Sequence, residues 1–143
     1  MLVQLSDELS PVFAPRGNTV ALHLAEDLTV EADPEKLARV FSNILKNAAS
    51  YSYPHTEITI SAEKSEHEVI IQFQNSGEDI PSEALASLFD KFYRADKSRS
   101  SDTGGTGLGL AIAKEIVVLH GGTISAASKN HVVTFTISLS LAH

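Results

Sequence analysis

The chain contains a glycine string at residues 104–110, Gly-Gly-Thr-Gly-Leu-Gly-Leu, and an apolar run at 111–119 follows it without a break. Glycine allows the backbone to take left-handed conformations and to lie against a ligand without an intervening Cβ. A helix that begins at such a string points unpaired N–H groups and the positive end of its dipole at the loop, an arrangement that binds phosphate. The alternative is a flexible linker ahead of a core helix. Taken alone, the pattern leaves both interpretations open.

Two common phosphate-binding folds fit the string poorly. No Gly-Lys-Ser/Thr follows the glycines, so the pattern is not a Walker-type P-loop. The stretch 94–103 in front of it is polar rather than strand-like, which weakens the case for a dinucleotide-binding fold.

Length and composition limit the broad class of the protein. The 143 residues are 43% hydrophobic, enough for one domain with a real core. The absence of cysteine excludes disulfides and thiolate metal sites. A net charge of −7 argues against broad binding to nucleic acid or to an anionic membrane. No apolar run approaches the roughly 20 residues that cross a bilayer. We therefore expect no nucleic-acid partner and no direct membrane contact.

The hydrophobic pattern predicts a mixed α and β fold. Helical spacing of apolar residues and helix-start signals predict helices at 2–13, 33–51, 81–88 and 107–119. Short alternating or clustered apolar runs predict strands at 19–24, 28–31, 57–62, 68–74, 123–127 and 132–139. The economical arrangement is one sheet covered on one face by helices.

The predicted helix at 33–51 carries two asparagines away from its apolar stripe. Asn43 and Asn47 lie one helical turn apart, so their side chains share a face. Amide oxygens at this spacing can hold a hard cation such as Mg²⁺, which prefers oxygen ligands and bridges phosphates. The alternative is a solvated polar face that happens to contain two asparagines.

A third polar signal follows the predicted strand at 68–74. Asn75 stands at the strand end, and Gly77 follows two residues later. An amide there can present both an acceptor and a donor to a planar heterocycle. The simpler interpretation of this segment alone is an Asx-type turn.

These signals gain weight from their order along the chain. Asn43 and Asn47, then Asn75-x-Gly77, then Phe89-x-x-Phe92-Tyr93-Arg94, then Gly105-x-Gly107-x-Gly109 resemble the N, G1, F and G2 boxes of sensor histidine kinases. These boxes mark the catalytic, ATP-binding domain of those kinases. The domain belongs to the ATPase superfamily that also includes gyrase, a heat-shock chaperone and mismatch-repair proteins. The phrases VFSNILKNAASYS and FDKFYRADKSRSSDTGGTGLGLAIAKEIV are similar to the vancomycin-resistance sensor kinases.

The resemblance implies a fold and an activity. The expected fold is the α/β two-layer sandwich of the Bergerat type, with a mixed sheet covered on one face by three main helices. Residues 1–143 would form a single catalytic domain with a mobile ATP lid at about 94–106. The domain would transfer the γ-phosphoryl group of Mg-ATP to a histidine on an adjacent dimerisation domain, from which a response regulator would receive it. It would be cytoplasmic, as part of a membrane-anchored sensor whose acceptor and sensor regions lie outside this chain.

The resemblance also implies roles for individual residues. Asn47, with Asn43 beside it, would coordinate Mg²⁺ and serve catalysis. Asn75 would read adenine, Gly77 would allow close approach to the nucleotide, and Phe89 and Phe92 would anchor the lid. The other residues implied in binding ATP are Tyr51, Ile80, Phe92, Lys97, Arg99, Gly105, Thr106, Gly107, Leu108 and Gly109.

Three positions depart from the family pattern. Asn75 replaces a more usual Asp, yet an amide oxygen can still accept a hydrogen bond from the exocyclic amine of adenine. Asp79 replaces a second glycine and is expected to add charge near the site. Ser50 stands where many members carry a basic residue, so Lys97 or Arg99 would supply the positive charge instead. Asn43 fits the kinase pattern, but it stands where the hydrolytic relatives keep a glutamate that activates water, and an amide cannot act as that base.

None of the six histidines is followed by the Glu/Asp and Pro of an acceptor motif. His120 precedes Gly121-Gly122 and is predicted to end a helix. Two other functions stay open: a gyrase- or mismatch-repair-type ATPase, and an ATP-regulated interaction module without transferase activity.

Overall fold

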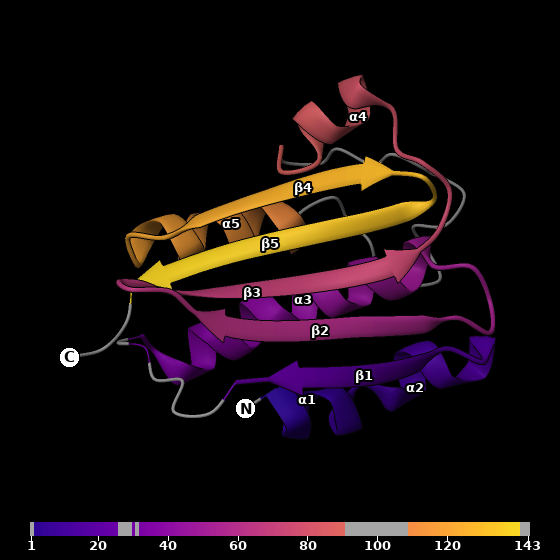
Figure 1. Ribbon diagram of the computed structural model, residues 1–143, viewed down its shortest axis with the longest axis horizontal. Helices are drawn as coiled ribbons and strands as arrows, with labels where there is room; N and C mark the ends of the chain where they lie inside the picture. The colour runs from indigo at the N-terminus through magenta and orange to yellow at the C-terminus, as the bar shows by residue number, and fades with distance from the viewer. Residues whose placement is uncertain (1, 26–29, 31, 91–108, 141–143) are drawn as a thin grey trace.

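A mixed sheet forms the centre of the computed structural model, which describes residues 2–25, 30, 32–90 and 109–140 (Figure 1). Its five strands are β1 (Thr19–Leu24), β2 (Glu57–Lys64), β3 (Glu68–Ser76), β4 (Thr123–Lys129) and β5 (Val132–Ser140). They lie in the order β1-β2-β3-β5-β4. β1 pairs with β2 in parallel, and the other pairs are antiparallel.

One face of the sheet is apolar because buried side chains alternate along the central strands. Phe73 of β3 and Phe135 of β5 are paired in the register and are both fully buried. The opposite face is polar, with hydrogen bonds from Gln72 to Thr136 and from Gln74 to Thr134. This alternation fixes which end-of-strand residues point toward the helices.

The helices pack on the apolar face. They are α1 (Leu2–Glu8), α2 (Ser10–Phe13), α3 (Pro34–Tyr51), α4 (Ser82–Ser87) and α5 (Gly109–Leu119). Figure 1 shows α3 and α5 side by side behind the sheet, and α1 packs against α3. The short α4 lies against β4 at the edge. The predicted α/β sandwich, with helices over one face of a mixed sheet, is confirmed.

The long helix α3 begins where the sequence predicts. The carboxylate of Asp33 accepts hydrogen bonds from the backbone N–H groups of Glu35 and Lys36 at 3.0 and 3.2 Å, and Pro34 occupies the first turn. Its buried side chains recur at helical spacing and pack into the core: Leu37, Val40, Phe41, Ile44, Leu45 and Ala48. The polar face of the helix is therefore fixed in direction.

The first predicted helix, at 2–13, was wrong as a single element. The chain forms α1 and α2 with Leu9 between them, and the N–H of Val12 bonds the carbonyl of Leu9 at 2.8 Å. Pro11 has no N–H to donate to the preceding turn, so it is tolerated only in the first turn of the new helix.

Other boundaries differ by a few residues. β3 continues through Asn75 to Ser76, so Asn75 lies inside the strand rather than after it. Of the predicted strand at 28–31, only Val30 is described, and it forms an isolated bridge. The proposed lid at 94–106 lies outside the described residues, as do these candidate ligands: Phe92, Lys97, Arg99, Gly105, Thr106, Gly107 and Leu108.

Arg16 closes the C-terminal end of α3, a contact that the sequence did not suggest. Its guanidinium donates to the carbonyls of Ala49 at 2.9 Å, Ser50 at 3.3 Å and Ser52 at 2.9 Å. A cation at this end satisfies orphan carbonyls and opposes the negative end of the helix dipole.

Replacing Arg16 by alanine is expected to lower the free energy of unfolding by about 2 kcal/mol, since it removes charged hydrogen bonds to several carbonyls. Arg16→Lys should recover only part of this loss, because one ammonium cannot reproduce the planar fork. Urea denaturation measures both variants. Arg39→Ala, at an exposed position of α3, is the matched control, and equal losses for Arg16→Ala and Arg39→Ala would contradict the capping role.

Candidate functional site

Three predicted site residues follow one another along a single face of α3. Asn43, Asn47 and Tyr51 are four residues apart in turn, so their side chains lie one above the other. The first of them reaches α5, because Nδ2 of Asn43 donates to the carbonyl oxygen of Gly109 at 3.0 Å. This bond joins the asparagine helix directly to the start of the glycine-led helix. The structure thus brings the first and last predicted motifs together.

Asn47, in the middle of this row, holds an unsatisfied acceptor. Its Oδ1 is buried and takes no hydrogen bond from the residues that the structure describes. A buried polar atom without a partner costs free energy, so a native structure that keeps one needs a reason. An amide oxygen is a suitable ligand for a hard cation. Oδ1 of Asn47 is therefore suited to be a ligand of the predicted Mg²⁺ site.

Asn75 presents a second unsatisfied group, on β3. Its side chain lies on the helix-facing side of the strand, the same side as the side chain of Phe73, and the residue is only 2% exposed. Within the described part of the chain, neither Oδ1 nor Nδ2 has a hydrogen-bond partner. A donor and an acceptor held side by side in a dry environment fit the edge of a heterocyclic base.

Gly77 brings the end of β3 against the end of α3. A Cβ at this position would lie 2.1 Å from the carbonyl oxygen of Tyr51 and 3.3 Å from Nδ2 of Asn75. No side chain fits there, because the nearer atom belongs to the backbone. Glycine is thus required by packing, in addition to the predicted close approach of a nucleotide. Tyr51, Asn75 and Gly77 meet at one place.

Two further candidate residues lie in the packed part of the molecule. Ile80 is 7% exposed, and its N–H donates to Oγ of Ser128 at 2.8 Å. Phe89 packs edge-on against Phe135, with ring centroids 6.5 Å apart, and Nζ of Lys114 lies 6.0 Å from its centroid. Phe89 therefore packs against the core five residues before the proposed lid.

His120 ends α5, as the sequence predicts. Its Nδ1 lies 2.8 Å from the carbonyl oxygen of Ile116, and Gly121 takes the left-handed conformation with φ of 74°. The ring also receives a hydrogen bond at Nε2 from the backbone N–H of Asp33 at 3.2 Å. His120 thus ties the end of α5 to the cap of α3 and has a structural role.

Two residues that shape this region, Tyr53 and His131, were given no role by the sequence, and Asp79 was expected only to add charge. Tyr53 and His131 contact each other, and the carboxylate of Asp79 bonds the backbone of His131. The available signal was the pair Asn130-His131 between two predicted strands, since asparagine is common in two-residue hairpin turns.

Comparison with known proteins identifies the family. Residues 32–143 match the family described as "Histidine kinase-, DNA gyrase B-, and HSP90-like ATPase". The chain belongs to this family, and the predicted resemblance to sensor histidine kinases is confirmed.

Individual relatives agree with this assignment. The sensor protein VanS of Enterococcus faecium is 55% identical over 97% of this chain, which corresponds to 36% of VanS. The sensor histidine kinase WalK of Bacillus subtilis is 45% identical over 78% of this chain and 19% of WalK. The catalytic domain of the histidine kinase ThkA matches with a TM-score of 0.81 and 28% identity, over 98% of this chain and 92% of that domain.

The chain spans about a third of VanS and a smaller share of WalK. In the part of the chain that the structure describes, every helix is too short or too polar to cross a membrane.

Proposed function

We propose that this chain is the ATP-binding catalytic domain of a two-component sensor histidine kinase and transfers the γ-phosphoryl group of Mg-ATP to a histidine on an adjacent dimerisation domain. The observation that carries the proposal is that, among the described residues, the buried Oδ1 of Asn47 and both amide atoms of the buried Asn75 have no hydrogen-bond partner. They lie on the two elements, α3 and β3, that Gly77 holds in close contact. One amide supplies a cation ligand and the other a reader for a base.

Asn47 holds Mg²⁺ through Oδ1, with Asn43 one turn away as the second candidate ligand. The amide nitrogen of Asn43 donates its hydrogen bond to the carbonyl oxygen of Gly109. Oδ1 of Asn43 is therefore the atom that faces a cation as a ligand. Bound Mg²⁺ supplies charge neutralisation and orientation of the phosphates. Because the same hydrogen bond fixes the start of α5 against α3, it also fixes the distance between the proposed cation ligands and the N–H groups at the start of α5.

Asn75 reads adenine with both atoms of its amide. Oδ1 accepts from the exocyclic amine, and Nδ2 donates to the neighbouring ring nitrogen. The low-dielectric surroundings make these hydrogen bonds stronger than they would be in water. Tyr51, Gly77 and Ile80 complete the wall around the base. Residues 105–109 are the segment that we propose as the phosphate ligand, as their resemblance to the G2 box implies.

Transfer needs a partner that this chain does not supply. The proposed partners are the histidine phosphoacceptor domain of the same protein and then a cognate response regulator, on the cytoplasmic side of a membrane-anchored sensor. Catalysis by this domain consists mainly of positioning the nucleotide and neutralising its charge. Asn43 cannot take a proton from water, which disfavours the gyrase-type hydrolytic alternative.

The base-reading role predicts a specific defect. Asn75→Ala should weaken Mg-ATP binding by about 10- to 100-fold, since two buried hydrogen bonds to the ligand are lost. Its thermal stability without nucleotide should not fall, because the amide has no partner among the described residues. Isothermal titration with ATP and ADP, with and without Mg²⁺, measures the effect.

Two variants sharpen this test. Asn75→Asp keeps an acceptor for the amine of adenine and should retain binding. Gln74→Ala changes the neighbouring residue on the opposite face of β3 and should bind like the wild type. Unchanged affinity in Asn75→Ala would remove the residue from the site, and a wild-type chain that binds no ATP would overturn the proposed function.

A further inference from the structure

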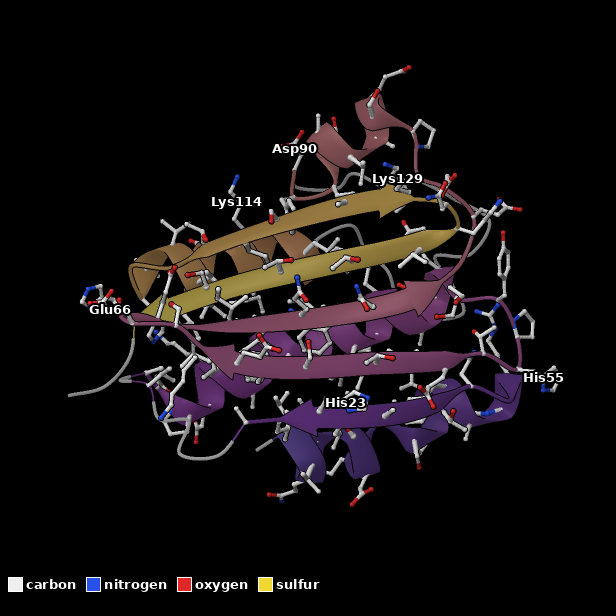
Figure 2. All side chains as sticks on the ribbon, in the orientation of Figure 1. His23, His55, Glu66, Asp90, Lys114 and Lys129 are labelled. Carbon is white, nitrogen blue, oxygen red and sulfur yellow. The ribbon has the colours of Figure 1, made fainter. Side chains whose placement is uncertain are left out.

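The loop that follows Asn75 is tied to the turn between β4 and β5. Asn130 and His131 form this turn with φ values of 53° and 62°, a left-handed pair typical of a tight two-residue hairpin. Figure 1 shows the turn at the same edge of the sheet as the end of β3, and Lys129 in Figure 2 marks the point where β4 enters it.

The backbone of His131 makes two of the connections. Its carbonyl oxygen accepts a hydrogen bond from the N–H of Gly77 at 3.0 Å. Its own N–H donates to Oδ1 of Asp79 at 2.7 Å. The loop and the turn are thus held by a reciprocal pair of bonds, one of which has a charged acceptor. Hydrogen bonds to charged groups are the stronger kind.

Side chains add two more connections on either side. The N–H of Ile80 donates to Oγ of Ser128 at 2.8 Å. The hydroxyl of Tyr53 lies 3.1 Å from Nδ1 of His131, and the two rings are 6.2 Å apart. Tyr53 follows the C-terminal end of α3, so the turn contacts both elements that hold the candidate base site. Residues 77–80 and Tyr53 thus contact the turn region at Ser128 and His131.

The position of Asp79 revises the expectation drawn from the sequence. Oδ1 of its carboxylate accepts a hydrogen bond from the backbone N–H of His131 in the turn. The neighbouring Glu78 is exposed, and its side chain has no hydrogen bond or ion pair with the described residues, so the two adjacent acids differ in their contacts. Charge alone would make them equivalent.

We propose that Asp79 is a positioning residue for nucleotide binding, which acts by locking the loop 77–80 onto the β4–β5 turn. This inference rests on the proposed function. Gly77 contacts the wall formed by Tyr51 and Asn75, so a loop released from the turn no longer holds that wall in the binding conformation. The bound base then has to order the loop, and the free energy needed to order it weakens nucleotide binding.

The test compares three single variants of the whole chain. Asp79→Ala removes the acceptor and should raise the Kd for Mg-ADP about tenfold. Its rate of phosphoryl transfer to an added histidine-bearing hairpin domain, at saturating ATP, should stay within about twofold of the wild type. Asp79→Asn keeps an oxygen acceptor at the same place and should restore most of the affinity. Glu78→Ala removes an equal charge from the adjacent position and should bind like the wild type.

The readouts separate positioning from simple stabilisation. Titration is done well below the melting temperature of each variant, and hydrogen exchange follows the amide of His131, which should lose protection in Asp79→Ala alone. Equal Kd changes in Asp79→Ala and Glu78→Ala would assign the effect to charge and overturn the inference. Unchanged affinity in Asp79→Ala, with a wild type that binds, would overturn this inference alone. A wild type that binds no nucleotide would overturn the proposed function and this inference with it.

Discussion

Replacing Asn47 by alanine is expected to reduce phosphoryl transfer by about 100-fold or more, because a metal-supported step loses several kcal/mol of charge stabilisation when its cation ligand is removed. Mg²⁺-dependent binding of ATP should fall with it. The nucleotide-free variant should be as stable as the wild type or more so, since Oδ1 of Asn47 is buried without a partner in the described structure. Thermal melts measure the stability, titrations with and without Mg²⁺ measure the binding, and labelling of an added histidine-bearing hairpin domain measures the transfer.

The neighbouring asparagine provides the matched control. Asn43→Ala removes the bond to the carbonyl of Gly109 and should cost about 1 kcal/mol of stability, which Asn47→Ala should not. Asn47→Asp keeps an oxygen ligand and should retain Mg²⁺-dependent binding. Full transfer activity in Asn47→Ala would exclude the metal role, whatever its effect on stability.

The parts of the site that the sequence predicts are those fixed by local periodicity. The spacing of Asn43, Asn47 and Tyr51 follows from 3.6 residues per turn, and Asp33 with Pro34 fixes where that helix begins. Asn75 was found because it stands two residues before a glycine at the end of an apolar strand. Its exact place inside β3 was missed, since strand ends depend on pairing with β5.

The contacts that hold these motifs together were not predictable in the same way. Arg16 meets the end of α3 through atoms 33 or more positions away in sequence, and Asp79 meets His131 across 52 positions. Such contacts depend on strand order and on the left-handed turn at Asn130 and His131. A single sequence reports the polar residue but not the partner, so Asp79 looked like added charge when it is a structural acceptor.

The isolated chain is expected to bind Mg-ATP or Mg-ADP while neither phosphorylating itself nor hydrolysing ATP at an appreciable rate. The proposed cation ligand, Asn47, lies on α3 and the proposed base reader, Asn75, lies on β3, so nucleotide binding should work in this chain alone. Transfer needs a nucleophile about 3 Å from the γ-phosphorus and in line with its leaving oxygen, and holding it there accounts for much of the rate.

The histidines of this sequence do not match the acceptor motif that supplies this nucleophile. No histidine stands in an acceptor motif, and His120 is occupied as a link between α5 and the cap of α3. Asn43 occupies the place of a general base without being able to accept a proton, so water is a poor substitute. Radiolabelled ATP, given to the chain alone and mixed with a histidine-bearing hairpin domain of the family, tests this directly. Label should appear on the hairpin only, since that domain supplies the acceptor histidine. Comparable label on the isolated chain, or release of phosphate at that rate, would contradict this prediction.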